Sequence, residues 1–211
     1  MKRASREGKI FDAALKLFAQ YGYKKTTLED VAGECGMTPG NIYFYVKNKK
    51  DLYEKTVRNA LDRWRASVAE AVANEKSAPE KFAVMARRSF EYLSDRGDIT
   101  AILSRDPDIF TLSPGEDRFR DINEGAMRIM EDILAQGVRE KSFHKMNVGH
   151  AAEFLFSVYI MFLIRAYVKK EGENVKRTFQ EGLGLILRGL CRKAPDGRNG
   201  RYAGSKPKKR A

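Results

Sequence analysis

Side chains suited to contacting DNA gather within residues 38–50, TPGNIYFYVKNKK. An asparagine such as Asn41 can read the edge of a base, and the hydroxyl of a tyrosine such as Tyr45 can bond to a phosphate. Lys49 follows at a predicted helix start, where a phosphate also meets free backbone N–H groups. The alternative is a core of aromatics beside a solvated lysine face. Consecutive helical positions lie about 100° apart, so at least one of the three aromatics at 43–45 points outward, which favours DNA contact.

Two short helices and a tight turn are expected to position these side chains. Apolar residues recur at i, i+3, i+4 and i+7 and predict an amphipathic first helix: Leu28, Val31, Ala32 and Cys35. Either Thr26 or Thr27 can cap its start, each with an acid three residues later, as in a capping box. We expect Gly36 to end this helix with a positive φ.

The second helix is predicted to start with Thr38 as its N-cap and Pro39 at its first position. Ile42 and Val46 are four residues apart and would anchor this helix to the core. The arrangement predicts a helix-turn-helix, whose second helix enters the major groove of DNA.

Residues 10–52 resemble the DNA-binding domain of the TetR (tetracycline repressor) family of bacterial transcription regulators. The matching residues occur in order: Phe18, Gly22-Tyr23, Thr26-Thr27, Val31-Ala32, Cys35-Gly36-Met37-Thr38, Gly40, Ile42-Tyr43 and 49–52. The sequence departs from the family pattern at Phe44, Tyr45 and Val46, where a Tyr, a His and a Phe are common.

The resemblance implies roles for individual residues. Thr27 and Thr38 would contact phosphates, Pro39, Gly40 and Asn41 would face base edges, and three residues would contact the DNA backbone: Tyr43, Tyr45 and Lys49. From their positions beside these residues, we add Phe44 and Lys47 to the predicted DNA contacts. Phe44 lacks the hydroxyl that a Tyr would supply, so it is not expected to hold a phosphate through oxygen.

The net charge of +12 is confined to the two ends of the chain. Residues 1–50 hold 10 Lys/Arg and 5 Asp/Glu, residues 191–211 hold 8 and 1, and residues 51–190 hold equal numbers. A basic end beside a neutral body is typical of a nucleic-acid partner. The tail, 193–211, lacks apolar periodicity and is predicted to be disordered, either adding non-specific DNA affinity or only improving solubility.

The remaining sequence predicts helices and almost no strand, with a main loop at 106–115. The expected helices are about 5–21, 49–73, 77–96, a short one capped by Asp98, 116–140, one from Asn147 to about 170, and one from Asn174 to about 191. Cys35 and Cys191 have no metal or redox spacing, and Cys35 is expected to be a small buried residue. No signal peptide fits the N-terminus, so a reduced, cytoplasmic location is expected.

Two copies of the chain are expected to form a homodimer through the last two predicted helices. The run 154–164 is apolar nearly all round but shorter than the roughly 20 residues that cross a bilayer, which favours a buried helix over a membrane span. Gly182, Gly184 and Gly189 suggest a closely packed neighbour, although a weak terminal helix is the alternative. The resemblance implies dimerisation through these helices as a four-helix bundle.

No catalytic constellation is present in the sequence, and neither a metal ion nor a cofactor is expected. The resemblance instead implies a pocket for a small molecule in the helical body. Its predicted lining is aromatic and methionine-rich, although the same spacing suits a filled core: Trp64, Met85, Phe90, Phe110, Phe119, Met127, Met130, Tyr159 and Phe162. Arg165 would pair with an acidic ligand group, with Glu153, or with a carboxylate across the dimer.

The sequence therefore predicts an all-α protein in three parts: a helix-turn-helix domain at 1–48, a ligand-binding and dimerisation domain at 49–192, and the tail at 193–211. The expected function is a TetR-type repressor that leaves a palindromic DNA operator when an apolar or amphipathic ligand tilts the helix at 49–73. Two alternatives are a non-specific DNA-associated protein and a small-molecule sensor that acts through a protein partner.

Overall fold

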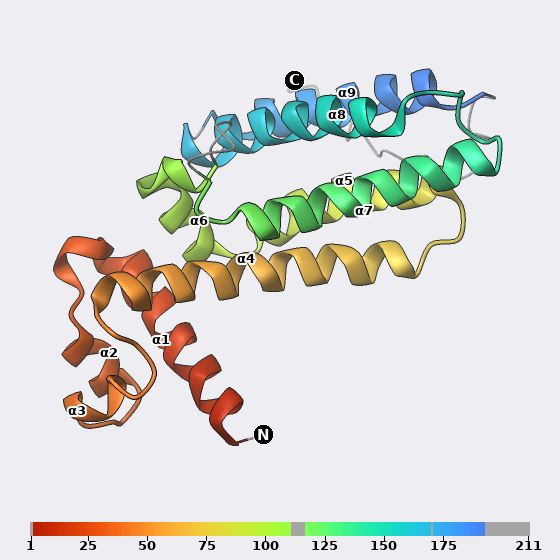
Figure 1. The fold of residues 1–211 in the computed structure, drawn as a ribbon. Helices are drawn as coiled ribbons and strands as arrows, with labels where there is room; N and C mark the ends of the chain where they lie inside the picture. Colours follow the sequence, from red (N-terminus) through yellow and green to blue (C-terminus); the bar gives the residue numbers. More distant parts are fainter. Residues whose placement is uncertain (1, 111–116, 170, 193–211) are drawn as a thin grey trace, which may run out of the picture.

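The computed structural model describes residues 2–110, 117–169 and 171–192. Within these ranges the chain is almost entirely helical (Figure 1). The elements in order are α1 (Lys2–Lys25), α2 (Leu28–Glu34), α3 (Pro39–Ile42), α4 (Lys49–Ala73), α5 (Ala78–Ser94), α6 (Gly97–Arg105), the 3₁₀ turn η1 (Pro107–Ile109), α7 (Arg120–Arg139), α8 (Val148–Leu163), the π-helical segment η2 (Ile164–Val168) and α9 (Glu173–Leu190). The predicted basic tail lies outside the described residues.

The N-terminal head consists of α1, α2, α3 and the start of α4. Thr27, not Thr26, caps α2, and its hydroxyl and the Asp30 carboxylate each bond to the other residue's backbone N–H. Thr26 is buried and donates its hydroxyl to the carbonyls of Leu17 and Gly22. Gly36 has the predicted positive φ, +64°, which glycine adopts at less cost than other residues.

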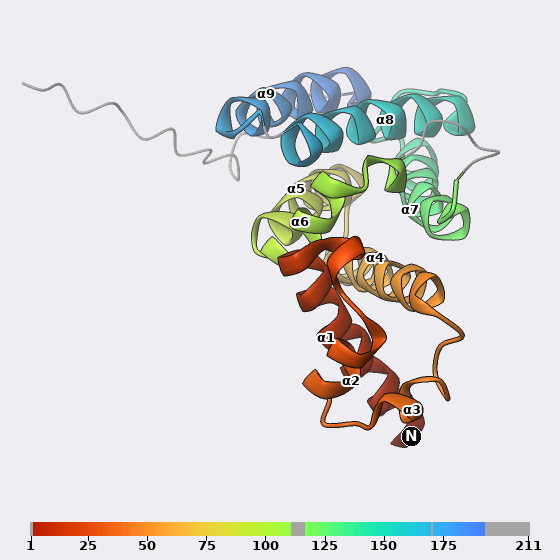
Figure 2. The same ribbon diagram turned by 90° about the vertical axis from the view of Figure 1, so that its left-hand side faces the viewer.

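The long helix α4 connects the head to the body. It packs against α1 in the head and against α5 and α7 in the body. Figure 2 shows the head below this helix, with α5, α6 and α7 above it and α8 and α9 forming the outermost layer. The bounds of α4 agree with the prediction, because its apolar residues recur at helical spacing from Leu52 to Val72 without interruption.

Several predicted helix ends were displaced. Asp98 lies inside α6, and its carboxylate accepts hydrogen bonds from Arg96 and from the backbone of Ile99. Helix α9 begins at Glu173 after Gly172, whose φ of +79° sets the turn, so Asn174 is not its N-cap. Helix α7 begins at Arg120, later than the predicted 116, because Phe119 is not in helical conformation.

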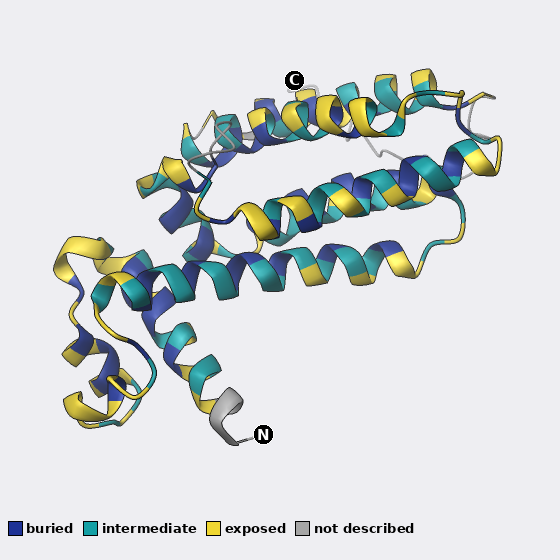
Figure 3. Cartoon of the chain, viewed as in Figure 1, coloured by how far each residue is buried: buried dark blue, intermediate teal, exposed yellow. Residues whose placement is uncertain are grey.

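Helix α8 and its π-helical continuation are more apolar than the predicted run suggested. Val148–Val168 has 21 residues, and an 18-residue window within it has a mean hydropathy of 1.6, which is long and apolar enough to cross a membrane by length and composition alone. The shortness of the run 154–164 therefore does not by itself exclude a membrane span. Only 28% of its most apolar window is buried within the chain. The described structure packs this helix against α7 and α9, and Figure 3 shows exposed residues along its outer side.

Candidate nucleic-acid interface and ligand cavity

The tip of the head exposes most of the predicted DNA-reading residues. Helix α3 is a single turn, held by Ile42 and Val46, which are 0% and 2% exposed as predicted. Its other residues face outward at the far end of the head from the body (Figure 3). Tyr43 and Phe44 are 54% and 75% exposed, so two of the three adjacent aromatics point outward. The exposed predicted contacts are Thr38, Pro39, Gly40, Asn41, Tyr43, Phe44 and Lys47, together with Thr27 at the start of α2.

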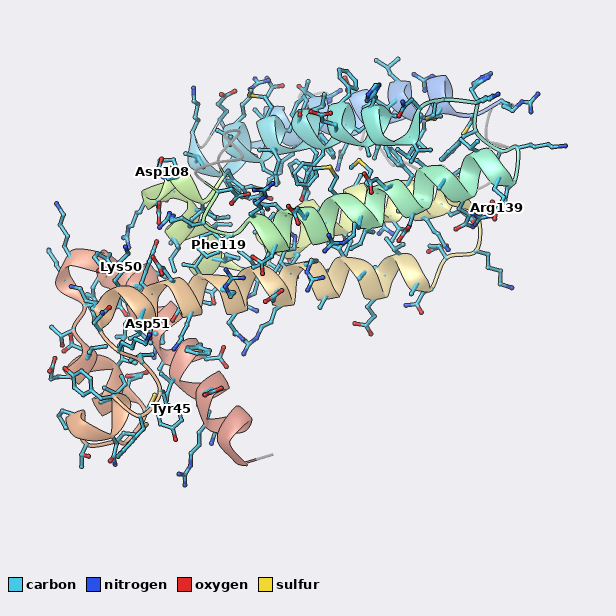
Figure 4. All side chains as sticks on the ribbon, in the orientation of Figure 1. Tyr45, Lys50, Asp51, Asp108, Phe119 and Arg139 are labelled. Carbon is cyan, nitrogen blue, oxygen red and sulfur yellow. The ribbon has the colours of Figure 1, made fainter. Side chains whose placement is uncertain are left out.

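Tyr45 and Lys49 are held by contacts within the head. Tyr45, labelled in Figure 4, lies in the turn between α3 and α4 and is half-buried against the core. The Lys49 ammonium donates to the carbonyl of Lys24 at 3.2 Å and lies 4.7 Å from the centre of the Tyr23 ring. These contacts tie the start of α4 to the end of α1, so Lys49 would have to share or leave them to bind a phosphate.

Asp51 occupies the N-terminal turn of α4. Its carboxylate accepts from the backbone N–H of Lys47 at 2.8 Å and from the Lys55 ammonium at 3.0 Å. Lys55 also donates to the carbonyl of Tyr45, which ties the α3–α4 turn to the helix. Burial acts to raise the pKa of Asp51, but these hydrogen bonds outweigh it and leave that pKa below its ordinary value.

An apolar cavity lies in the body between α4, α5, α7, α8 and α9. Its volume is about 90 Å³, against the roughly 10–15 Å³ that one water molecule needs. Five of the nine predicted lining residues contribute to its wall: Trp64, Met85, Phe110, Met130 and Tyr159. The wall is otherwise mostly aliphatic and aromatic, and burial raises the pKa of the Tyr159 phenol above its ordinary value.

The other four predicted lining residues lie elsewhere. Phe119 is buried at the start of α7 (Figure 4), with the guanidinium groups of Arg58 and Arg118 over its ring. Phe90 and Phe162 both pack on the ring of Phe179 at centroid distances of 4.3 and 5.3 Å, and Phe90 faces a separate surface groove between α5 and α9. Met127 is half-buried against the core.

Sequence periodicity missed several residues of the cavity wall. Phe179 of α9 lines it, as do the polar residues Arg65, Ser89 and Asn123. The Trp64 indole donates to the carbonyl of Ser89 at 3.1 Å, which joins α4 to α5. Ala126 and Met130 follow Asn123 at i+3 and i+7, so all three lie on one face of α7. This spacing from the predicted lining residue Met130 could have identified Asn123 as part of the wall.

One segment links the cavity to the head. Ile109 and Phe110 line the cavity. Three residues before Ile109, the Asp106 carboxylate accepts a hydrogen bond from the hydroxyl of Tyr53 in α4. Arg105, at the end of α6, donates to the carbonyls of Phe18, Ala19 and Gln20, shortly before the kink of α1 at Gly22. The head is thus joined to the body through α6 as well as through α4.

Arg165 lies in η2 and pairs with Glu171 at 2.7 Å. The predicted pairing with Glu153 within the chain was wrong, because the π-helical turn and the bend after it bring Glu171 to the guanidinium. Arg165 is outside the cavity wall, so the prediction that it meets a ligand has no support from its position.

Comparison with known proteins finds similarity to bacterial transcription regulators. Residues 10–56 match the model of the bacterial regulatory proteins of the tetR family. The chain is 25% identical over 195 residues to the HTH-type transcriptional repressor KstR2 of Mycolicibacterium smegmatis, covering 92% of this chain and 94% of that protein. It is 23% identical over 148 residues to the fatty acid metabolism regulator protein of Bacillus subtilis, covering 70% and 76%.

Solved structures share the whole helical fold. FadR from Bacillus subtilis in complex with stearoyl-CoA superposes with a TM-score of 0.70 at 20% identity, covering 86% of this chain and 98% of that one. FadR from Bacillus halodurans gives 0.71 at 17% identity, covering 88% and 96%. These relatives are transcriptional regulators, and the matched segment holds the helix-turn-helix described above. Residues 10–56 thus match the bacterial regulatory proteins of the tetR family, and over most of its length the chain resembles the transcriptional repressor KstR2.

Proposed function

We propose that the protein is a dimeric, cytoplasmic transcriptional repressor that reads a palindromic operator through α3 and leaves it when an apolar or amphipathic ligand occupies the cavity. The observation that carries this proposal is the exposed tip of the head. It presents Asn41, Tyr43 and Lys47 to solvent while Ile42 and Val46 fix the tip to the core. Direct readout of base edges requires polar side chains that are held on a rigid support.

The composition of the cavity supports an apolar ligand skeleton. Its wall is built of aliphatic, aromatic and methionine side chains, with few polar groups. The FadR structure with stearoyl-CoA makes long-chain acyl compounds the first ligands to test. The KstR2 structure, described as a ketosteroid regulator, makes polycyclic ligands the second.

The exposed faces of α8 and α9 support a homodimer. Phe154 and Met161 are seven residues apart on one face of α8 and are 66% and 47% exposed, and Leu185 of α9 is 65% exposed. A Cβ added at Gly182 or Gly189 would meet no described atom within 4 Å, so packing within the protomer does not explain these glycines. Burying these side chains against a second copy would remove an apolar surface from water.

The dimer interface is tested by Phe154→Glu, a change on the exposed face that leaves the core of the protomer intact. We expect the full-length protein to sediment as a dimer and this variant to shift to a monomer at micromolar concentration. The matched control is Ala66→Glu, at an exposed position on α4, which packs against α1, α5 and α7 and lies outside the proposed interface. A Phe154→Glu variant that remains dimeric would place the interface elsewhere.

The operator is tested by selecting bound sequences from a library of random DNA duplexes at physiological salt. The experiment uses the full chain and a version that ends at Arg192, because the basic tail can bind DNA without reading its sequence. We expect both proteins to enrich the same palindrome, and Asn41→Ala to relax its sequence by the equivalent of about 1–3 kcal/mol at one position in each half-site. Binding that enriches no sequence and depends on the tail would refute the proposal.

A further inference from the structure

We propose that Arg65 binds the acidic group of an amphipathic ligand whose apolar part fills the cavity. This inference rests on the proposed ligand response and assigns a chemical class to one end of the ligand. Arg65 follows Trp64 on α4, and both side chains line the cavity. Among the described residues that line the cavity, Arg65 alone is cationic.

The guanidinium of Arg65 is only partly satisfied in the described structure. Its Nη2 donates to Asp62 at 3.0 Å, one turn earlier on the same helix. Its Nε is buried and has no hydrogen-bond partner among the described residues. A buried donor without a partner costs free energy, so an acceptor that reached Nε would gain the full benefit of that bond.

The backbone of α7 leaves room for this side chain. Gly125 is buried opposite Arg65, and a Cβ there would lie 3.1 Å from Nη1 and 3.2 Å from Cδ. The side chain of Arg65 therefore passes between α4 and α7 over a glycine. Its outer part is in contact with solvent, since 41% of the side chain is exposed, while its Nε is buried. Arg65 thus lies between the apolar interior and water.

A purely structural role explains these observations less well. The Asp62–Arg65 pair joins two residues of one helix with both side chains more than 40% exposed, and exposed pairs of this kind contribute little to stability. Such a pair does not need Nε to be buried or α7 to carry a glycine opposite. An anionic oxygen group at the end of an apolar tail accounts for both, because a guanidinium binds carboxylates and phosphates through two parallel N–H donors.

The test compares three probes of equal chain length by calorimetry: decanoic acid, decanoyl-CoA and decan-1-ol. Decanoic acid offers a carboxylate, the CoA ester offers phosphates, and the alcohol offers neither. We expect at least one anionic probe to bind the native dimer about tenfold or more tightly than the alcohol. The Arg65→Gln variant is expected to lose that advantage while its affinity for the alcohol stays within about twofold.

Arg58→Gln is the matched control. Arg58 also reaches from α4 to α7, where it pairs with Asp121 at 2.6 Å, but it does not line the cavity. We expect this variant to bind all three probes as the native protein does. The anionic probe that loses affinity in Arg65→Gln, but not in Arg58→Gln, identifies a carboxylate or a phosphate as the group bound.

Two results would overturn the inference while leaving the proposed regulator intact. Equal binding of acid, CoA ester and alcohol by the native protein would show that no anion is recognised. Equal loss of all probes in Arg65→Gln, with an unchanged melting temperature, would show that Arg65 only shapes the wall. If the native protein binds none of the probes while selecting an operator, the inference and the acyl-type ligand fail together, and the DNA-binding proposal stands.

Discussion

The hydroxyl of Tyr53 donates to the carboxylate of Asp106 at 2.9 Å, and Arg118 binds both oxygens of the same carboxylate at 2.8 Å. Tyr53 belongs to α4 and packs edge-on against Phe18 of α1, with ring centroids 5.1 Å apart. Asp106 lies three residues before Ile109 in the cavity wall. Because one carboxylate holds residues near the cavity against residues of the head, displacement of Ile109 by a ligand would be transmitted to α4.

Replacing Tyr53 with Phe tests this connection while keeping the aromatic packing. The variant loses one hydrogen bond, and its free energy of unfolding is expected to fall by about 0.5–1.5 kcal/mol. Ligands typically change the affinity of a coupled site by about 5–150-fold, and we expect that factor to decrease in the variant while operator affinity without ligand is retained. The measurement is the operator Kd with and without saturating ligand. An unchanged factor would mean that coupling does not pass through Tyr53.

Arg105 offers a second test of how the body controls the head. Its guanidinium binds three successive carbonyls of α1, those of residues 18–20, shortly before the kink at Gly22, where φ is +83°. A planar group with several donors suits this task better than an ammonium. We expect Arg105→Ala to weaken operator binding about tenfold or more, since hydrogen bonds to charged groups contribute about 1.5–3 kcal/mol.

Arg105→Lys is the matched variant, because it keeps the charge and loses the planar fork. Its operator affinity is expected to lie between those of the native protein and Arg105→Ala. If both variants bind the operator as the native protein does, α6 does not orient the head, and control passes through α4 alone. Fluorescence anisotropy with a labelled operator distinguishes these outcomes.

Local signals predicted the elements of the head and the length of α4, because their causes lie within one or two helical turns. Gly36 adopts the positive φ expected from its position, and Asn147 caps α8 through the N–H of His150. The half-buried state of Cys35, in place of the expected burial, is a small exception that follows from its position at the end of α2.

Local sequence patterns could not predict the contacts between segments that lie far apart in the chain. Neither the seating of Arg65 over Gly125 nor the binding of Arg105 to α1 has a signature in residue spacing, since each joins segments far apart in the chain. The predicted cavity lining succeeded for four residues on regular helices, Trp64, Met85, Met130 and Tyr159, and for Phe110, which follows η1. It failed for Phe119, which sits in the irregular turn before α7, and for Phe90, which faces α9 instead.

Gly137 provides a prediction about packing at the end of the body. It lies on α7 beneath the ring of Phe143, and a Cβ added there would come within 2.6 Å of Cγ of that ring. Phe143 is 1% exposed and lies in the turn that pairs with the end of α9, so its ring has little freedom to move. Gly137→Ala is expected to destabilise the protein by about 1–3 kcal/mol through overpacking, despite the better helix propensity of Ala.

Gly33→Ala is the control for Gly137→Ala. Gly33 lies in α2, where an added Cβ would meet no described atom within 4 Å, so Ala is expected to stabilise the helix by up to about 1 kcal/mol. Urea unfolding followed by circular dichroism measures both variants. Equal effects of the two substitutions would contradict the packing explanation.

The carboxylate of Asp51 predicts a dependence of stability on pH. Its pKa in the folded protein lies below the ordinary value of 3.8, because the donors Lys47 and Lys55 outweigh the effect of burial. A carboxyl with a lowered folded pKa stabilises the protein above its unfolded pKa, and this contribution is lost as the pH falls below about 4. Asp51→Asn should therefore cost roughly 0.5–1 kcal/mol at pH 7, because the ion pair with Lys55 is partly exposed.

The same substitution should cost less at pH 3, where the native carboxyl has begun to take up a proton. Urea midpoints at the two pH values give the difference between native and variant proteins, and this difference is expected to shrink with acid. Glu70→Gln, at an exposed position on the same helix, is the control and should follow the native protein at both pH values. A difference that stays constant, or grows with acid, would mean that Asp51 is bound through its shape and not through its charge.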